Sequence, residues 1–167
     1  MNLVLTGFMG TGKTVIGKAI ADRLNRKYVD VDTLIEEWKN KKISEIFAEE
    51  GEEAFREYES EMIEVAVASS NVVISCGGGA VLKPGNMDKL ENNGVVVCLS
   101  ARPEVIFERV KDGNTRPLLA VKDPLSKIKE ILKNREKYYG RCAFSIDTSD
   151  LSVEEVVQLV LEKTNLS

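Results

Sequence analysis

The chain has 167 residues, a length that suits one domain with a β-sheet covered by helices on both faces. Its net charge is -4, from 23 basic and 27 acidic residues, and the lysines are scattered between acidic residues. Nothing resembles the basic stripe of a nucleic-acid-binding protein, so we expect small-molecule partners. The sequence contains no histidine, which excludes an imidazole base and a His-ligated zinc site. Any acid–base chemistry must therefore use carboxylates.

The three cysteines, Cys76, Cys98 and Cys142, are widely spaced in or beside apolar runs, which predicts buried, reduced thiols. No segment resembles a secretion signal, and no apolar run approaches the roughly 18 residues that a membrane helix needs. We therefore expect a cytoplasmic protein without membrane contact. We find no repeat or domain boundary, and we expect a single monomeric domain over residues 1–167.

The first predicted strand, over 3–5, leads into Gly7-Phe8-Met9-Gly10-Thr11-Gly12-Lys13-Thr14, and a helix is expected over 15–24. The segment fits the phosphate-binding P-loop, G-x-x-x-x-G-K-[ST]. Its glycines let backbone N–H groups turn inward around a polyphosphate at the positive end of the following helix. Lys13 is expected to reach the β- and γ-phosphates, and the Thr14 hydroxyl to bind Mg²⁺. The expected nucleotide-binding residues here are Met9, Gly10, Thr11, Gly12, Lys13 and Thr14.

The second predicted strand, over 28–31, ends in Asp30-Val31-Asp32. The capping-box spacing of Thr33 and Glu36 predicts that a helix begins there. The two aspartates then lie at the carboxyl end of a strand, where ligands bind in open α/β sheets. Because side chains alternate along a strand, we expect Asp30 and Asp32 on opposite sides, one near Mg²⁺ and the other facing an acceptor hydroxyl. The residues alone leave open that Asp32 only caps the helix.

The next predicted elements are helices over 44–49 and 52–69 and a buried strand over 72–75. Arg56 lies on the second helix, four residues after Glu52. The residues alone leave open that its only role is an exposed ion pair with Glu52. The strand runs into Gly77-Gly78-Gly79, and such a glycine run at a strand end signals close approach by another group.

The remaining predicted elements are a loop and helix over 83–93, a strand over 95–99, a helix from about 103, a helix over 124–139, a strand over 144–146 and a helix from the capping box at 152–155. Residues 111–123 are polar and rich in turns, and a loop of this length in a compact domain is usually a lid or a binding element. Within it, Arg116 is placed to stabilise charge on a transferring phosphoryl group. Arg135, like Arg56, could be only a surface ion pair.

These segments together resemble the shikimate kinase family. The resemblance is carried by the P-loop, Asp30-Val31-Asp32, Phe47-x-x-x-Gly51-Glu52-x-x-Phe55-Arg56-x-x-Glu59, Gly77-Gly78-Gly79-Ala80-Val81, Arg116-Pro117-Leu118-Leu119, and Arg135 with Tyr139. It implies a three-layer α/β P-loop kinase fold, with a five-stranded parallel sheet flanked by helices and a mobile lid over about 111–123. It also implies transfer of the γ-phosphate of ATP to the 3-hydroxyl of shikimate, in the chorismate route to aromatic amino acids.

The resemblance further implies roles for individual residues. Lys13, Asp32 and Arg116 would be catalytic, with Asp32 the candidate base, and Thr14 and Asp30 would hold Mg²⁺ directly and through its water shell. A substrate-binding helical region is implied over about 32–60. The implied shikimate-binding residues are Asp32, Arg56, Gly77, Gly78, Gly79 and Arg135. The implied nucleotide-binding residues beyond the P-loop are Arg109, a candidate to stack on adenine, and Arg116.

Two alternatives stay open on the residues. One is another small-molecule P-loop kinase, of the gluconate or nucleoside-monophosphate type, since gluconate also carries a carboxylate and hydroxyls. The other is a nucleotide-dependent switch or a non-catalytic nucleotide-binding module. A GTPase switch would need an N-K-x-D motif, and Asn40-Lys41-Lys42-Ile43 lacks the aspartate. A module that had lost catalysis would be expected to lack Lys13, Asp32 or Arg116, and all three are present.

Overall fold

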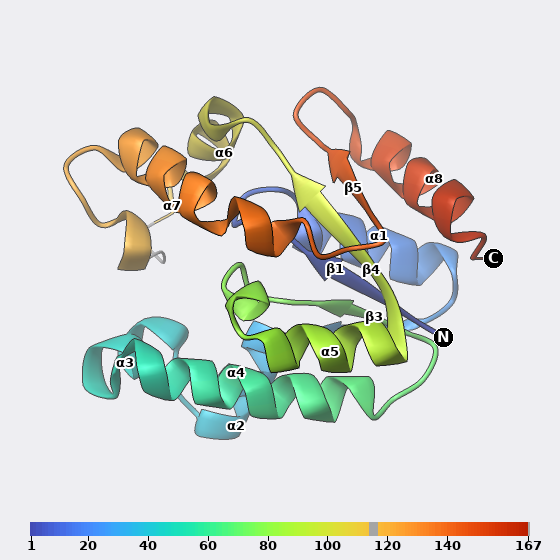
Figure 1. Ribbon diagram of the computed structural model, residues 1–167, viewed down its shortest axis with the longest axis horizontal. Helices are drawn as coiled ribbons and strands as arrows, with labels where there is room; N and C mark the ends of the chain where they lie inside the picture. The colour runs from blue at the N-terminus through green and yellow to red at the C-terminus, as the bar shows by residue number, and fades with distance from the viewer. Residues whose placement is uncertain (114–116, 167) are drawn as a thin grey trace.

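Five parallel strands form the centre of the part of the chain that the computed structural model describes, residues 1–113 and 117–166 (Figure 1). The strands are β1 (Asn2–Thr6), β2 (Lys27–Asp30), β3 (Val72–Ser75), β4 (Gly94–Ser100) and β5 (Phe144–Asp147). Their order across the sheet is β2-β3-β1-β4-β5, and all neighbours run parallel. The predicted five-stranded parallel sheet is confirmed.

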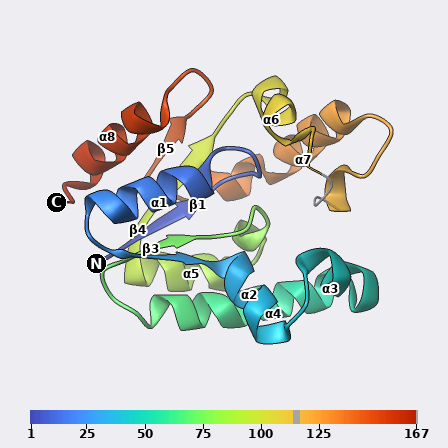
Figure 2. The same cartoon turned by 180° about the vertical axis from the view of Figure 1, so that it is seen from behind.

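Eight α-helices and two short 3₁₀ helices surround this sheet in the described residues. The α-helices are α1 (Lys13–Arg23), α2 (Val31–Lys39), α3 (Ile43–Glu49), α4 (Gly51–Val67), α5 (Pro84–Asn93), α6 (Pro103–Val110), α7 (Pro124–Tyr139) and α8 (Val153–Thr164). The 3₁₀ helices are η1 (Ala80–Leu82) and η2 (Pro117–Leu119). Seen from behind, α1 and α8 lie side by side over the sheet, whereas α4 and α5 pack together on its other side (Figure 2). The result is the predicted three-layer arrangement.

Alternation along the strands supplies an apolar core on both faces of the sheet. Leu3 and Leu5 of β1 are buried in a cluster with α1 and α8, while Val4 between them is buried in a cluster with α2 to α5. Burial on both faces is why these strands read as continuous apolar runs. A third cluster, beneath α6 and α7, contains Phe8 of the P-loop. The loop that holds the phosphate site is thereby fixed to the core.

The sheet register brings the candidate residues together at one edge. Leu5 of β1 pairs with Ser75 of β3 and with Val97 of β4, and Asp30 of β2 also pairs with Ser75. Since the strands are parallel, the segments that follow β1, β2 and β3 leave the sheet at the same edge. These are the P-loop, the two aspartates and the triple glycine.

The start of α2 differs from the prediction. The strand ends at Asp30 rather than at residue 31, and α2 begins at Val31 with Asp30 as its N-cap, whose carboxylate accepts a hydrogen bond from Thr33 N at 3.1 Å. The expected helix start at the Thr33–Glu36 spacing was therefore wrong. Because Asp32 lies in the first turn of α2, it neither caps the helix nor alternates with Asp30 along a strand.

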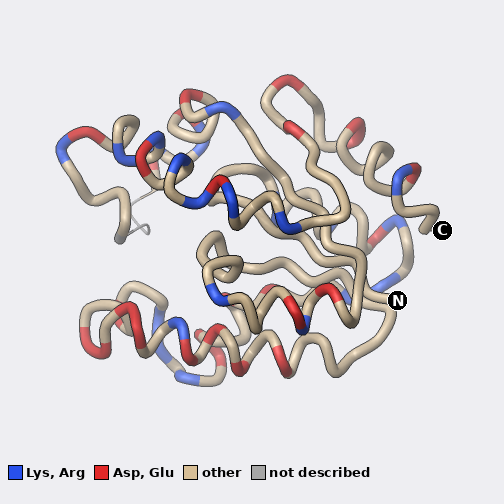
Figure 3. The backbone as a smooth tube through the Cα atoms, in the orientation of Figure 1, with Lys and Arg blue, Asp and Glu red and all other residues tan. Residues whose placement is uncertain are grey.

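Charged residues of both signs are mixed along the helices, and the central strands contain few of them (Figure 3). Cys76 and Cys98 are buried, as predicted, and Cys142 is half-buried; all three are free thiols. Burial raises the pKa of the Cys98 thiol to about 11, so it stays protonated at neutral pH. No helix within the described ranges combines the length and the apolar character needed to cross a bilayer.

Candidate active site

The P-loop folds tightly between β1 and α1. Gly7 and Gly12 have φ values of +133° and +99°, in the region that favours glycine, and a Cβ on Gly7 would collide with the carbonyl oxygen of Leu99. The loop is closed by Thr11, whose hydroxyl donates to the Phe8 carbonyl at 2.8 Å. The backbone at the amino end of α1 is thus shaped by the chain itself, which suits a polyphosphate at the positive end of this helix.

Lys13 lies over this loop. Its Nζ donates to the carbonyl oxygens of Gly7 at 2.7 Å and Phe8 at 2.9 Å. The ammonium group is therefore held on the inner side of the loop, near the place where phosphate oxygens would lie.

A small cavity of about 90 Å³ lies directly at the P-loop. Its lining includes Lys13, Thr14, Asp30 and Asp32, so both aspartates face the same space. The two oxygens of Asp30 already accept hydrogen bonds, one from Thr33 N and one from the Tyr28 hydroxyl at 3.0 Å. This donor set fits a Mg²⁺ ion, which the Thr14 hydroxyl and Asp30 would hold. The described residues contain no group of three or more Asp, Glu or Cys side chains around one point, and a phosphate-bound Mg²⁺ does not need one.

A larger cavity of about 420 Å³ adjoins the first. Its walls come from α2, α3, α4, the triple glycine, η2 and α7. The cavity therefore lies between the helices that follow β2 and helix α7. The lining includes Asp32, Ser44, Phe47, Phe55, Arg56, Glu59, Leu118 and Arg135. Four residues, Met9, Asp32, Gly77 and Gly78, line both cavities. The two spaces therefore meet at Asp32, between the P-loop and the triple glycine.

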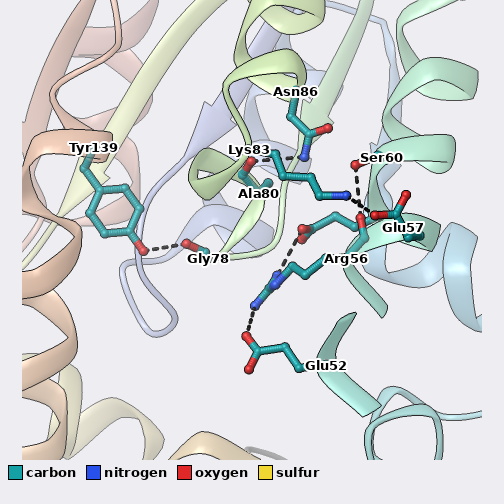
Figure 4. A network of polar contacts seen from close by, with 10 residues as sticks. Glu52, Arg56, Glu57, Ser60, Gly78, Ala80, Lys83, Asn86 and Tyr139 are labelled. Carbon is teal, nitrogen blue, oxygen red and sulfur yellow. Dashed lines mark hydrogen bonds and ion pairs between the residues drawn. The ribbon is translucent and has the colours of Figure 1, made fainter. Parts of the chain in front are cut away.

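Two arginines from different helices reach the larger cavity. Arg135 of α7 is 8% exposed, so the alternative of a surface ion pair is wrong for it. The Arg56 side chain is 12% exposed, and it pairs with Glu52 at 3.2 Å, as the spacing allowed (Figure 4). It also pairs with buried Glu59 at 3.0 Å. Two buried guanidinium groups in one cavity favour a small anion as its ligand.

Each residue of the triple glycine faces a different partner. A Cβ on Gly77 would lie 2.8 Å from Asp32 Oδ1 and 2.9 Å from Glu59 Oε1, and a Cβ on Gly79 would collide with the guanidinium of Arg56. The Cβ position of Gly78 lies 3.5 Å from Met9 N of the P-loop. The close approach predicted from the glycine run is confirmed, and the approaching groups are those that line the two cavities.

Glu59 is a site residue to which sequence reasoning gave no role. It is fully buried, and Oε1 has no hydrogen-bond partner in the described part of the chain. Burial raises the pKa of Glu59 to about 7, with Asp32 adding to the effect and Arg56 opposing it. The available signal was its position on α4, on the same face as Phe55, Met62 and Ile63, where an ionisable residue is rare.

A third cavity, of about 230 Å³, lies beside the P-loop between α1 and α8. Arg109 lines it, and its guanidinium donates to Gly10 O at 3.1 Å and to Thr148 Oγ1 and O at 3.0 and 2.9 Å. The remaining lining is mostly aliphatic and includes Val15, Leu151, Val153 and Val156. A flat apolar ring beside an arginine fits this space. Stacking of Arg109 on adenine remains a prediction.

Arg116, the expected lid arginine, lies outside the described residues. Leu118 of η2, two residues later, lines the larger cavity. The predicted lid segment therefore has at least one described residue at the site.

The fold and the connected cavities define a P-loop nucleotide-binding protein with an adjoining pocket lined by two arginines. A family model described as shikimate kinase matches residues 9–165. A shikimate kinase of Caldanaerobacter subterraneus subsp. tengcongensis is 46% identical over 160 residues, which cover 96% of this chain and 94% of that protein. One of Thermodesulfovibrio yellowstonii is 46% identical over 162 residues, which cover 97% and 94%.

Among solved structures, a shikimate kinase of Acinetobacter baumannii in complex with shikimate matches with a TM-score of 0.95 and 32% identity, over 98% of this chain and 92% of that one. The chain belongs to the shikimate kinase family. It is therefore a phosphotransferase. This excludes the two alternatives of a nucleotide switch and a non-catalytic module.

Proposed function

We propose that this protein transfers the γ-phosphate of ATP to the 3-hydroxyl of shikimate, giving shikimate 3-phosphate and ADP. The observation that carries the proposal is the larger cavity, in which Arg56, Arg135 and Asp32 meet beside the P-loop. The structural likeness to a shikimate kinase that binds shikimate supports the same assignment.

The acceptor is recognised by complementary groups. Shikimate carries one carboxylate and three hydroxyls, so the carboxylate pairs with Arg56 and Arg135 while the ring lies against Phe47 and Phe55. Asp32 and the backbone of the triple glycine then meet the hydroxyls. This orientation points one hydroxyl through the junction of the two cavities, toward the phosphate site, which matters because phosphoryl transfer depends mainly on positioning.

The nucleotide lies along the P-loop with its base in the cavity beside Arg109. Met9 to Thr14 hold the phosphates with backbone N–H groups, and Lys13 and Arg116 stabilise charge on the transferring group. Thr14 and Asp30 would hold Mg²⁺, which when bound would neutralise charge on the phosphates. Asp32 takes up or orients the proton of the attacking hydroxyl.

The proposal is tested by ADP release from purified protein with Mg·ATP, in parallel reactions with shikimate, gluconate, AMP and CMP. We expect strong stimulation by shikimate alone, with shikimate 3-phosphate as the product by mass spectrometry. Stimulation by gluconate or a nucleotide and not by shikimate would retain the kinase and refute the acceptor.

A further inference from the structure

Tyr139 connects α7 to the triple-glycine segment. It is the last residue of α7, and its hydroxyl donates a 2.6 Å hydrogen bond to the carbonyl oxygen of Gly78 (Figure 4). The ring packs against two core clusters, the one beneath α4 and α5 and the one beneath α6 and α7. Burial raises the pKa of Tyr139, and the charge of Arg135 together with a side-chain hydrogen bond from Arg135 opposes the rise, so the hydroxyl stays protonated and remains a donor at neutral pH.

Gly78 is the middle residue of the triple glycine, and it lines both cavities. Its Cβ position lies 3.5 Å from Met9 N and 3.6 Å from Gly7 O of the P-loop. Its neighbours Gly77 and Gly79 lie against Asp32 and Arg56. A displacement of Gly78 would therefore move the wall against which both the aspartate and one of the arginines are packed.

Arg135 lies one turn before Tyr139 on α7, so the two side chains share a face of the helix. One helix thus supplies both an acceptor-binding guanidinium and a bond that holds the opposite wall of the cavity. The P-loop itself does not depend on this bond, because Thr11 and Lys13 close the loop from within.

We propose that Tyr139 is a positioning residue of the kinase reaction, whose hydroxyl holds the triple-glycine segment at the distance from Arg135 and the P-loop that acceptor binding requires. The inference rests on the proposed function for its acceptor, shikimate. In this role Tyr139 touches neither substrate; it acts through Gly78.

Tyr139→Phe tests the proposal because it removes the hydroxyl and keeps the ring between the two clusters. Tyr138→Phe is the matched control, since Tyr138 is half-buried on the same helix and its hydroxyl makes no hydrogen bond within the described chain. We expect Tyr139→Phe to raise the KM for shikimate roughly fivefold or more, the factor that corresponds to one lost hydrogen bond. The KM for ATP should stay within about twofold, and Tyr138→Phe should match the unchanged protein.

Hydrogen exchange of the free protein provides a readout without turnover. The backbone amides of residues 77–82 should exchange faster in Tyr139→Phe than in Tyr138→Phe. Unchanged exchange, or faster exchange with an unchanged KM for shikimate, would overturn the proposal. A lower kcat with both KM values unchanged would also overturn it, since that is the effect of a smaller folded fraction. Failure of the unchanged protein to phosphorylate shikimate would refute the proposed function, whereas the exchange comparison would still report on the Tyr139 bond.

Discussion

Asp32 lies at the junction of the two cavities, and its side chain lines both of them. Asp32→Asn keeps the size and hydrogen-bonding capacity of the side chain but cannot accept a proton. If the carboxylate acts in the transition state, kcat should fall roughly a hundredfold while the KM for shikimate changes only a few-fold. Steady-state kinetics decide this. An equal loss in kcat and in shikimate affinity would leave Asp32 only a binding role.

We expect Glu59 to make the stability of the protein depend on pH. Its pKa is about 7 in the folded protein against an ordinary value of 4.5, so the folded state binds the proton more tightly. The stabilisation from this proton is complete below about pH 4.5 and is lost as the pH rises through about 7. We expect a loss on the order of 3 kcal/mol over this range, which urea unfolding at pH 4.5 and 8 measures.

Glu59→Gln is the control for that prediction, because glutamine fills the same space and does not titrate. As the pH rises, the free energy of unfolding of the unchanged protein should fall relative to that of this variant. A difference that is constant with pH would show that Glu59 has the same pKa in the folded and unfolded chains.

Gly79 is tested by its contact with Arg56. Gly79→Ala would place a methyl group on the guanidinium of Arg56, which must then leave its present position. We expect roughly a tenfold rise in the KM for shikimate, because a charge-assisted contact to the carboxylate is lost, and little change in melting temperature. Gly85→Ala on α5, where a Cβ meets nothing within 4 Å, is the control and should leave the kinetics unchanged. Equal effects of the two variants would contradict the contact.

At the scale of elements, the two capping signals in the sequence had different outcomes. Ser152 and Glu155 form the predicted capping box at the start of α8. Thr33 and Glu36 show the same spacing, but Asp30 caps α2 one turn earlier. Local spacing does not determine which of two nearby polar residues caps the helix. The register of β2 against β3 fixes Asp30 at the edge of the sheet, where the helix begins.

The cap of α8 contributes to stability and lies away from the acceptor. Ser152→Ala removes the hydroxyl that accepts a hydrogen bond from Glu155 N. We expect a loss of about 1 kcal/mol in the free energy of unfolding, measured in urea, with kcat and the KM for shikimate unchanged. A large fall in kcat would show that the cap also orders the nucleotide cavity.

Across the whole molecule, the sheet, its helices and the P-loop could be predicted from the sequence because periodicity and a specific motif report them directly. The burial of Arg56 and Arg135 could not, since spacing along one helix is the same for a surface ion pair and for a cavity wall. The hydrogen bond from Tyr139 to Gly78 could not be predicted either, because the two residues are 61 positions apart along the chain. Contacts between distant segments depend on tertiary packing, which periodicity does not report.

The proposed recognition of the acceptor carboxylate by Arg56 and Arg135 is tested most directly by comparing kcat/KM for shikimate and for its methyl ester, in the unchanged protein and in Arg56→Met and Arg135→Met. Methionine keeps an apolar stem and removes the charge. The unchanged protein should prefer shikimate roughly a hundredfold or more, and each variant should lose a large part of that preference. Equal use of acid and ester by the unchanged protein, or a preference that survives in both variants, would contradict the carboxylate clamp.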